Sequence, residues 1–191
     1  MQEYVTEAVV LDAVPSAELD VRVSLFTKKF GKLVARAKSV KKITSKLAGH
    51  LEPGNVVKIR LVEKKGLQLV DALKEKEVSI NPPDLYLLNQ ILHEAEPDHE
   101  LWELLTGGAF RWHEALRILG WDPAAADCAG PHTKRASTPS AQDAHNARSG
   151  VGVGHPSTSS GNKVTAFHIK TQEFYCSACA SKVRRNEVIL L

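Results

Sequence analysis

The sequence predicts an α+β protein of several units: an N-terminal OB-fold β-barrel, then a small helical domain with a zinc-finger-like unit at the C-terminus. Stretches that alternate apolar and charged residues come first, apolar residues at helical spacing follow, and a Cys-x-x-Cys pair lies near the end. Formal charge changes at the same places, from +5 over residues 1–78 to −7 over 79–127 and +5 over 128–191. We therefore expect three units with these boundaries.

Five strand-like stretches define the first unit. They cover residues 4–11, 21–27, 32–38, 56–63 and 67–72. Gly66 supplies the positive φ that a tight hairpin between the last two requires. Residues 44–51 are rich in Lys, Leu and Ala and predict a short helix that ends before Pro53-Gly54. Three strands, a helix and two strands is the order of an OB-fold, and the helix favours this fold over an SH3-like barrel.

Positive charge is concentrated in residues 22–66. This segment holds thirteen Lys and Arg residues against Glu52 and Glu63, a net charge of +11 in a protein of only +3. A Lys-rich run is often no more than a solvated face. Here the cations alternate with apolar residues, as in Val57-Lys58-Ile59-Arg60-Leu61, so one face enters a core and the other holds the cations in a fixed geometry. Such a field on a near-neutral protein indicates a polyanionic partner, and nucleic acid is the one we expect.

Nine of these cations are the candidate phosphate contacts. They are Arg22, Lys28, Lys29, Lys32, Arg36, Lys38, Lys41, Lys42 and Lys46. Aromatic residues are scarce in this unit: Phe26 is expected in the core, and Phe30 fits either the core or an exposed stacking position. Many cations with few stacking groups predict salt-sensitive binding without sequence preference.

The middle unit predicts three short helices. Asp84 follows Asn81-Pro82-Pro83 as a candidate N-cap. Apolar stripes at helical spacing then cover residues 85–92, 101–105 and 112–119. Arg111 and Arg117 are the only cations of this acidic unit; they either offset neighbouring carboxylates or pair with an acidic partner.

The motif Cys176-Ser177-Ala178-Cys179 dominates the last unit, where it follows a strand-like stretch over residues 165–175. Two thiolates at this spacing supply half of a tetrahedral zinc site. Cys128 and His132 are the candidates for the other half, and the less well spaced alternatives are His145, His155 and His168. A structural Cys3His zinc site and a decayed site without metal are both open.

Other functions of the cysteines fit the sequence less well. A thioredoxin-like pair would need a βαβ context, and a catalytic zinc would need a general base beside it. Three cysteines, an odd number, argue against a disulfide framework. Between the two ligand groups, residues 133–162 are rich in small and polar residues and predict a flexible loop.

Several motifs, in their order and spacing over about 70 residues, resemble the RecO family of bacterial recombination mediators. They are Ala8-Val9-Val10-Leu11, Leu25-Phe26-Thr27-Lys28-Lys29-Phe30-Gly31-Lys32-Leu33, Lys38-Ser39-Val40-Lys41-Lys42, Ser45-Lys46-Leu47 and Leu51-Glu52-Pro53. The resemblance implies an OB barrel followed by a helical domain with a zinc-binding insertion, where the family has a second Cys-x-x-Cys but this chain has Pro131.

The resemblance also implies a function in recombinational DNA repair. It implies binding of single- and double-stranded DNA, strand annealing, and recombinase loading with RecR and the C-terminal tail of single-strand binding protein. An OB-fold RNA-binding module in ribosome or transfer RNA handling is the alternative, and a zinc-ribbon interaction protein is a third hypothesis.

Features of an enzyme or a membrane protein are not found in the sequence. His93-Glu94 and His113-Glu114 lack the second histidine of a zinc protease, and no nucleophile elbow or Walker motif occurs. No apolar run approaches the roughly 18 residues of a membrane span, and the first residues do not form a secretory signal. We therefore expect a non-catalytic, cytoplasmic and nucleoid-associated protein.

Overall fold

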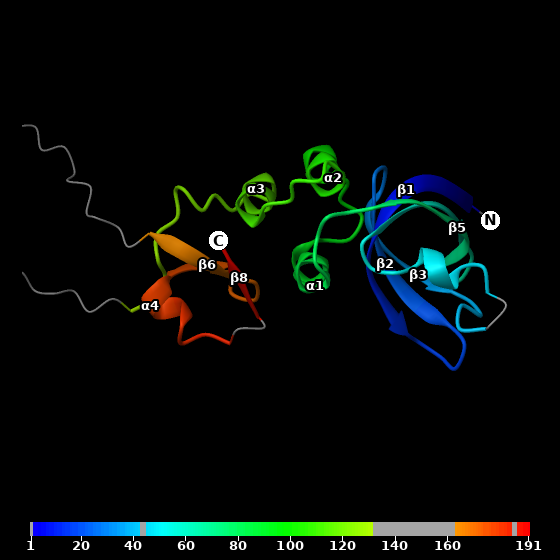
Figure 1. Ribbon diagram of the computed structural model, residues 1–191, viewed down its shortest axis with the longest axis horizontal. Coiled ribbons are helices and arrows are strands. Elements are labelled where there is room, and N and C mark those ends of the chain that lie inside the picture. The colour runs from blue at the N-terminus through cyan, green and yellow to red at the C-terminus, as the bar shows by residue number, and fades with distance from the viewer. Residues whose placement is uncertain (1, 43–44, 132–162, 185–186) are drawn as a thin grey trace, which may run out of the picture. The chain divides into compact units, whose positions relative to one another are not determined.

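The structure, a computed structural model, describes residues 2–42, 45–131, 163–184 and 187–191 (Figure 1). Contacts between residues divide the chain into two compact units, 1–124 and 125–191. The first contains a barrel and three helices, and the second contains a small sheet.

A closed barrel of five strands makes up most of the first unit (Figure 1). The strands are β1 (Gln2–Pro15), β2 (Val21–Thr27), β3 (Gly31–Ala37), β4 (Asn55–Glu63) and β5 (Leu67–Glu77). Their order around the barrel is β1-β2-β3-β5-β4, and β1 closes it by pairing with both β2 and β4. All pairs are antiparallel except β3 with β5. This is the predicted OB-fold order, and β1 and β5 are longer than expected.

Alternation along the strands decides which side chains fill the barrel. On β4, Val57, Ile59 and Leu61 are buried in the core, whereas Lys58 and Arg60 are exposed. The same period of two separates apolar and polar residues on a pleated strand. The predicted division between an apolar interior and a cationic exterior is therefore present on β4.

The helix expected over residues 44–51 is instead a single 3-10 turn, η1 (Ala48–His50). Its N-cap, Leu47, makes no side-chain capping bond, and glycine lies within the turn at position 49. Glycine disfavours the helical state and an uncapped start leaves N–H groups unpaired. The side-chain amide of Asn55 donates to the carbonyls of Gly49 and His50, at 3.3 and 3.2 Å, and ties this turn to the start of β4.

Three helices follow the barrel: α1 (Pro82–Ile91), α2 (His99–Thr106) and α3 (Trp112–Ile118). The expected N-cap of α1 was wrong by one helical turn, because Asn81 caps it by accepting the Asp84 N–H at 2.9 Å. Pro82 then occupies the first turn, where its missing N–H costs nothing. The Asp84 carboxylate accepts the Trp112 indole N–H at 2.8 Å instead, which links α1 to α3.

The helices pack on the barrel. Leu85 and Leu88 are fully buried, and Phe26 is 1% exposed beside residues of the helical segment, which confirms its expected core position. A Cβ built on Gly31 would lie 2.2 Å from the carbonyl oxygen of Glu96, so the backbones approach closely at this point. Barrel and helices thus lie together in the compact unit 1–124.

The second unit contains a three-stranded antiparallel sheet in the order β7-β6-β8. Its elements are β6 (Val164–His168), β7 (Glu173–Cys176), the short helix α4 (Ser177–Ala180) and β8 (Val188–Leu190). The single strand expected over 165–175 is therefore a hairpin, and its turn places Gln172 at a φ of 56°. The predicted loop over 133–162 lies outside the described residues. No helix in the described part of the chain is long and apolar enough to cross a membrane.

Candidate nucleic-acid interface and metal centre

Two arginines lie directly opposite each other on β2 and β3. Arg22 pairs in register with Arg36, and both side chains are exposed. Like charges at directly opposed positions destabilise a sheet. The Asp20 carboxylate, 2.6 Å from the Arg36 guanidinium, offsets part of this repulsion. The pair lies on the strands that OB-folds use to bind oligonucleotides.

Asp20 anchors one of these arginines and the loop that follows β3. Its carboxylate accepts the Arg36 Nε–H at 2.9 Å and the backbone N–H of Ser39 at 2.8 Å. These bonds, first that from the Ser39 backbone and then that from Arg36, hold the pKa of Asp20 below its ordinary value. The Arg36 side chain nevertheless remains 57% exposed.

The same loop carries three of the predicted contact residues. The backbone N–H of Lys41 donates to the carbonyl of Leu19 at 3.2 Å, and the side chain of Val40 is buried. Lys38, Lys41 and Lys42 are exposed around these anchors. The loop backbone is therefore fixed to the loop between β1 and β2, while its ammonium groups face solvent.

A hollow of about 450 Å³ joins the end of β3 to the turn between β4 and β5. Arg36, Lys38, Lys64 and Lys65 line it, which brings four cations together from two distant parts of the sequence. The parallel pairing of Arg36 with Gln68 explains the meeting, because it sets the end of β3 beside the start of β5. Lys64 and Lys65 were not among the predicted contacts, although the loop between strands four and five of an OB-fold is a known binding element.

The turn between β2 and β3 carries two more exposed cations, Lys28 and Lys29. The Lys28 ammonium lies 3.7 Å from the Glu7 carboxylate and 5.9 Å from the centre of the Trp102 ring. Exposed pairs of this kind contribute little to stability. Lys46 is also exposed, just before η1.

Lys32 differs from the other predicted contacts because the protein itself uses its ammonium group. Its Nζ donates to the carbonyl oxygens of Asn89 and Leu92, at 2.5 and 3.1 Å, where α1 ends. A cation at this position complements the negative end of the helix dipole. Burial lowers the pKa of Lys32, with a smaller opposing effect from Glu94. We therefore assign Lys32 to the contact between barrel and helices.

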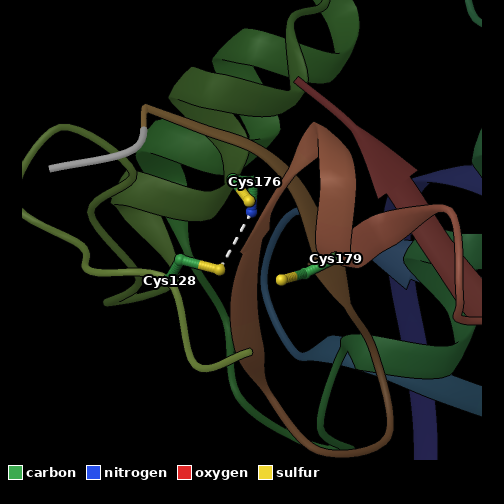
Figure 2. Close-up of side chains that lie close together, drawn as sticks. All are labelled: Cys128, Cys176 and Cys179. Atoms are coloured by element: carbon green, nitrogen blue, oxygen red, sulfur yellow. Dashed lines mark hydrogen bonds between the residues drawn. The ribbon is translucent and has the colours of Figure 1, made fainter. Parts of the chain in front are cut away.

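Three cysteines meet in the second unit (Figure 2). Cys176 ends β7, Cys179 lies in α4 and Cys128 precedes the sheet, and their Sγ atoms all lie within 4.8 Å of one another. The side chains of Cys128 and Cys179 point toward each other (Figure 2). Sulfurs bound to one tetrahedral zinc at about 2.3 Å each lie roughly 3.8 Å apart, so small movements would bring these three to that spacing.

The backbone around the cysteines supports a site for a cation. The N–H groups of Cys176 and Gly130 donate to the Cys128 sulfur at 3.2 and 3.4 Å. A Cβ built on Gly130 would lie 2.3 Å from the Cys179 sulfur, so only glycine leaves room for the cluster. Burial, helped by the neighbouring cysteines, raises the pKa of the Cys179 thiol to about 11, whereas hydrogen bonds led by that from the Cys179 N–H lower the pKa of Cys176. Three sulfurs this close together could hold a metal ion.

The histidines expected as further ligands are not part of this cluster in the described residues. His132 lies outside them, as do His145 and His155. His168 is described, but its ring nitrogens lie 2.9 Å from Thr171 Oγ1 and 3.3 Å from the Glu187 carboxylate. Within the part of the chain that the structure describes, the cluster that could hold a metal thus consists of the three cysteines.

Comparisons with known proteins find a match for the residues that form the barrel. Residues 1–77 match the family model described as Recombination protein O N terminal. The chain is also 32% identical over 117 residues to DNA repair protein RecO of Myxococcus xanthus, and 34% identical over 133 residues to DNA repair protein RecO of Cutibacterium acnes. The N-terminal part of this chain is thus similar to RecO proteins.

The two alignments cover 55% and 63% of this chain and 48% and 51% of the relatives, so the chain spans about half the length of the curated RecO proteins it matches. The RecO family model covers the whole barrel, including the hollow and the Arg22–Arg36 pair. It ends before α1, so the cysteine cluster lies outside this match.

Proposed function

We propose that this chain is a non-catalytic DNA-binding protein of recombinational DNA repair. The observation that carries the proposal is the set of exposed cations on β2, β3, their adjoining loops and the turn between β4 and β5, on a barrel similar to the N-terminal part of RecO. Phosphate contacts position a nucleic acid without reading its sequence. Single- and double-stranded DNA are therefore both ligands of this surface, with Arg22, Arg36, Lys38, Lys64 and Lys65 at its centre.

The salt dependence of binding gives the number of DNA phosphates that the protein neutralises. For single strands, each phosphate contact contributes about 0.7 to the slope of log affinity against log salt. Lys38→Gln with Lys65→Gln removes two charges from the hollow. This double variant is expected to make the slope less negative by about 1.4. The matched control is Lys58→Gln with Arg60→Gln, which removes two exposed charges from β4, a strand that pairs with neither β2 nor β3.

Equal slopes for the two double variants would contradict the assignment of the surface. The competing RNA function is tested by the same titration with an RNA of equal length and sequence. Preference for RNA requires contacts to the 2′-hydroxyl, so tighter binding of the RNA would favour that function. Equal affinity, or preference for DNA, is the expected result.

We propose strand annealing and recombinase loading as the consequences of this binding, with RecR and the C-terminal tail of single-strand binding protein as partners. Cations that neutralise phosphates on two strands at once reduce the repulsion between them, which favours annealing. An acidic tail would require a cation on the helices. Arg111 already lies 3.8 Å from Glu114 on α3, so Arg117, exposed in the last turn, is the better candidate.

The test of this partner is binding of a labelled tail peptide to wild-type protein and to Arg117→Gln. Loss of binding in the variant is expected. Unchanged binding would remove α3 from the proposed docking surface, and no binding to the wild type would remove the tail as a ligand.

We propose that Cys128, Cys176 and Cys179 hold a structural zinc ion, with His132 as the fourth ligand. Zinc bound here would stabilise the second unit, whose sheet has only three strands. Elemental analysis of purified protein should find one equivalent of zinc, and Cys176→Ser should lose it. His132→Ala should weaken retention against a chelator, while His168→Ala serves as the histidine control. Absence of zinc from the wild type would contradict the site.

A further inference from the structure

A second, apolar pocket lies in the first unit beside the cationic hollow. It measures about 300 Å³, and its lining includes Tyr4, Phe30, Leu33 and Leu67. Leu67 also lines the hollow that holds Arg36, Lys38, Lys64 and Lys65, so the two sites adjoin. Pockets of about 300 Å³ are at the small end of those that bind small organic groups, which suits a single ring system.

The pocket opens at one end of the barrel. Tyr4, Leu33 and Leu67 are half-buried and pack against the edge of the barrel core. Phe30, also half-buried, meets the Tyr4 ring edge-to-face, with 5.3 Å between ring centres and an angle of 78°. The barrel thus presents aromatic and aliphatic faces beside the four cations of the hollow.

A hydrogen bond fixes the Tyr4 ring. Its hydroxyl donates to the Glu63 carboxylate at 2.7 Å, and this bond raises the pKa of Tyr4. A carboxylate accepts several hydrogen bonds, so Glu63 retains acceptor capacity at the pocket. The Glu63 carboxylate repels a phosphate but can accept an N–H from the edge of a base. Lys29, which also lines the pocket, has the opposite charge and attracts the phosphate backbone of a nucleic acid.

We propose that this pocket holds one unstacked base of a single-stranded nucleic acid while the neighbouring phosphates lie in the cationic hollow. The inference rests on the proposed function and adds to it a contact that duplex DNA, with its bases stacked and paired, cannot make. Aromatic side chains beside a cationic groove are the combination that binds single strands. An apolar residue of an acidic peptide is the competing occupant.

Two labelled ligands of equal length test the inference: a single-stranded oligonucleotide and its abasic counterpart, which keeps the phosphates and lacks the bases. Wild-type protein should bind the first roughly ten-fold more tightly, the effect expected of one stacked base. Phe30→Ala should abolish this difference and leave the affinity for the abasic strand unchanged. Phe30→Tyr, which keeps an aromatic face, should restore it.

Tyr86→Ala is the matched control, because Tyr86 is an aromatic residue, 51% exposed, that lines neither the pocket nor the hollow. Unfolding followed by tryptophan fluorescence shows whether each variant is folded. Equal binding of both ligands by folded wild-type protein would overturn the base pocket but leave the phosphate surface intact. No binding of either ligand would overturn the proposed function. If Phe30→Ala lost binding of an acidic peptide but kept binding of the oligonucleotide, the pocket would be assigned to the peptide.

Discussion

Replacing Lys32 by methionine separates a structural cation from a DNA-binding one. The ammonium of Lys32 makes two hydrogen bonds to the carbonyls at the end of α1. Methionine keeps the aliphatic stem but leaves both carbonyls without this donor. The variant is therefore expected to weaken the contact between barrel and helices and to leave DNA binding by the folded protein unchanged.

The size of the effect follows from these two bonds. Hydrogen bonds to a charged group contribute about 1.5–3 kcal/mol each, and desolvation of the half-buried ammonium, which lowers its pKa, offsets part of that gain. We expect a net loss of about 2 kcal/mol. For a unit of this size the melting temperature should fall by roughly 8 °C.

Tryptophan fluorescence measures this loss in the first unit, because Trp102, Trp112 and Trp121 are the three tryptophans of the chain and all lie within residues 1–124. Lys29→Met is the control, since its side chain is exposed. It should leave the melting temperature unchanged and reduce the salt dependence of DNA binding. An unchanged melting temperature for Lys32→Met, or a reduced salt slope for it alone, would refute the structural assignment.

Three further predictions test the glycine contacts and the Asp20 anchor. Gly31→Ala should lower the fluorescence-detected melting temperature, because its φ of 68° disfavours other residues and the added Cβ would collide with the Glu96 carbonyl; an unchanged value would show that the two segments do not meet there. Gly130→Ala should lower zinc content, since its Cβ would displace the Cys179 sulfur; full zinc occupancy would contradict the cluster geometry. Asp20→Asn should speed hydrogen exchange of the Ser39 amide at neutral pH. The folded pKa of Asp20 lies below 3.8, so the hydrogen bonds that its carboxylate accepts are present above that pH and are lost as the pH falls through the folded pKa. The exchange rates of wild type and variant should therefore become equal at that low pH. A difference in exchange rate that persists there would exclude the carboxylate as the cause.

The barrel was predictable because its strands carry their own signal. Alternation on residues such as Val57, Lys58 and Ile59 is a local property, and Gly66 marks the hairpin that follows. The helix before β4 was wrong because composition alone favoured it, whereas the bonds from Asn55 to the turn are tertiary contacts. The hairpin of β6 and β7 was read as one strand because Gln172 turns the chain without glycine or proline.

The sequence predicted that the candidate site would be positively charged, but not which cations would lie together. Alternating cations identified the basic surface, yet no local pattern shows that Lys64 and Lys65 meet Arg36 across the parallel pairing of β3 and β5. The hydrogen bonds from Lys32 to the end of α1 could not be predicted either, because their acceptors lie more than fifty residues away in the sequence. The meeting of Cys128 with the Cys-x-x-Cys pair followed from metal-ligand chemistry, which requires distant residues to converge.

The most direct test of the account is a salt titration of single-stranded DNA binding by the wild-type protein. Affinity is measured by fluorescence anisotropy between about 50 and 200 mM salt, the range in which counterion release is readily seen. About five phosphate contacts predict a slope of log affinity against log salt of roughly −3.5. A slope near zero, or no binding at the low-salt end, would contradict a DNA-binding role for the barrel cations.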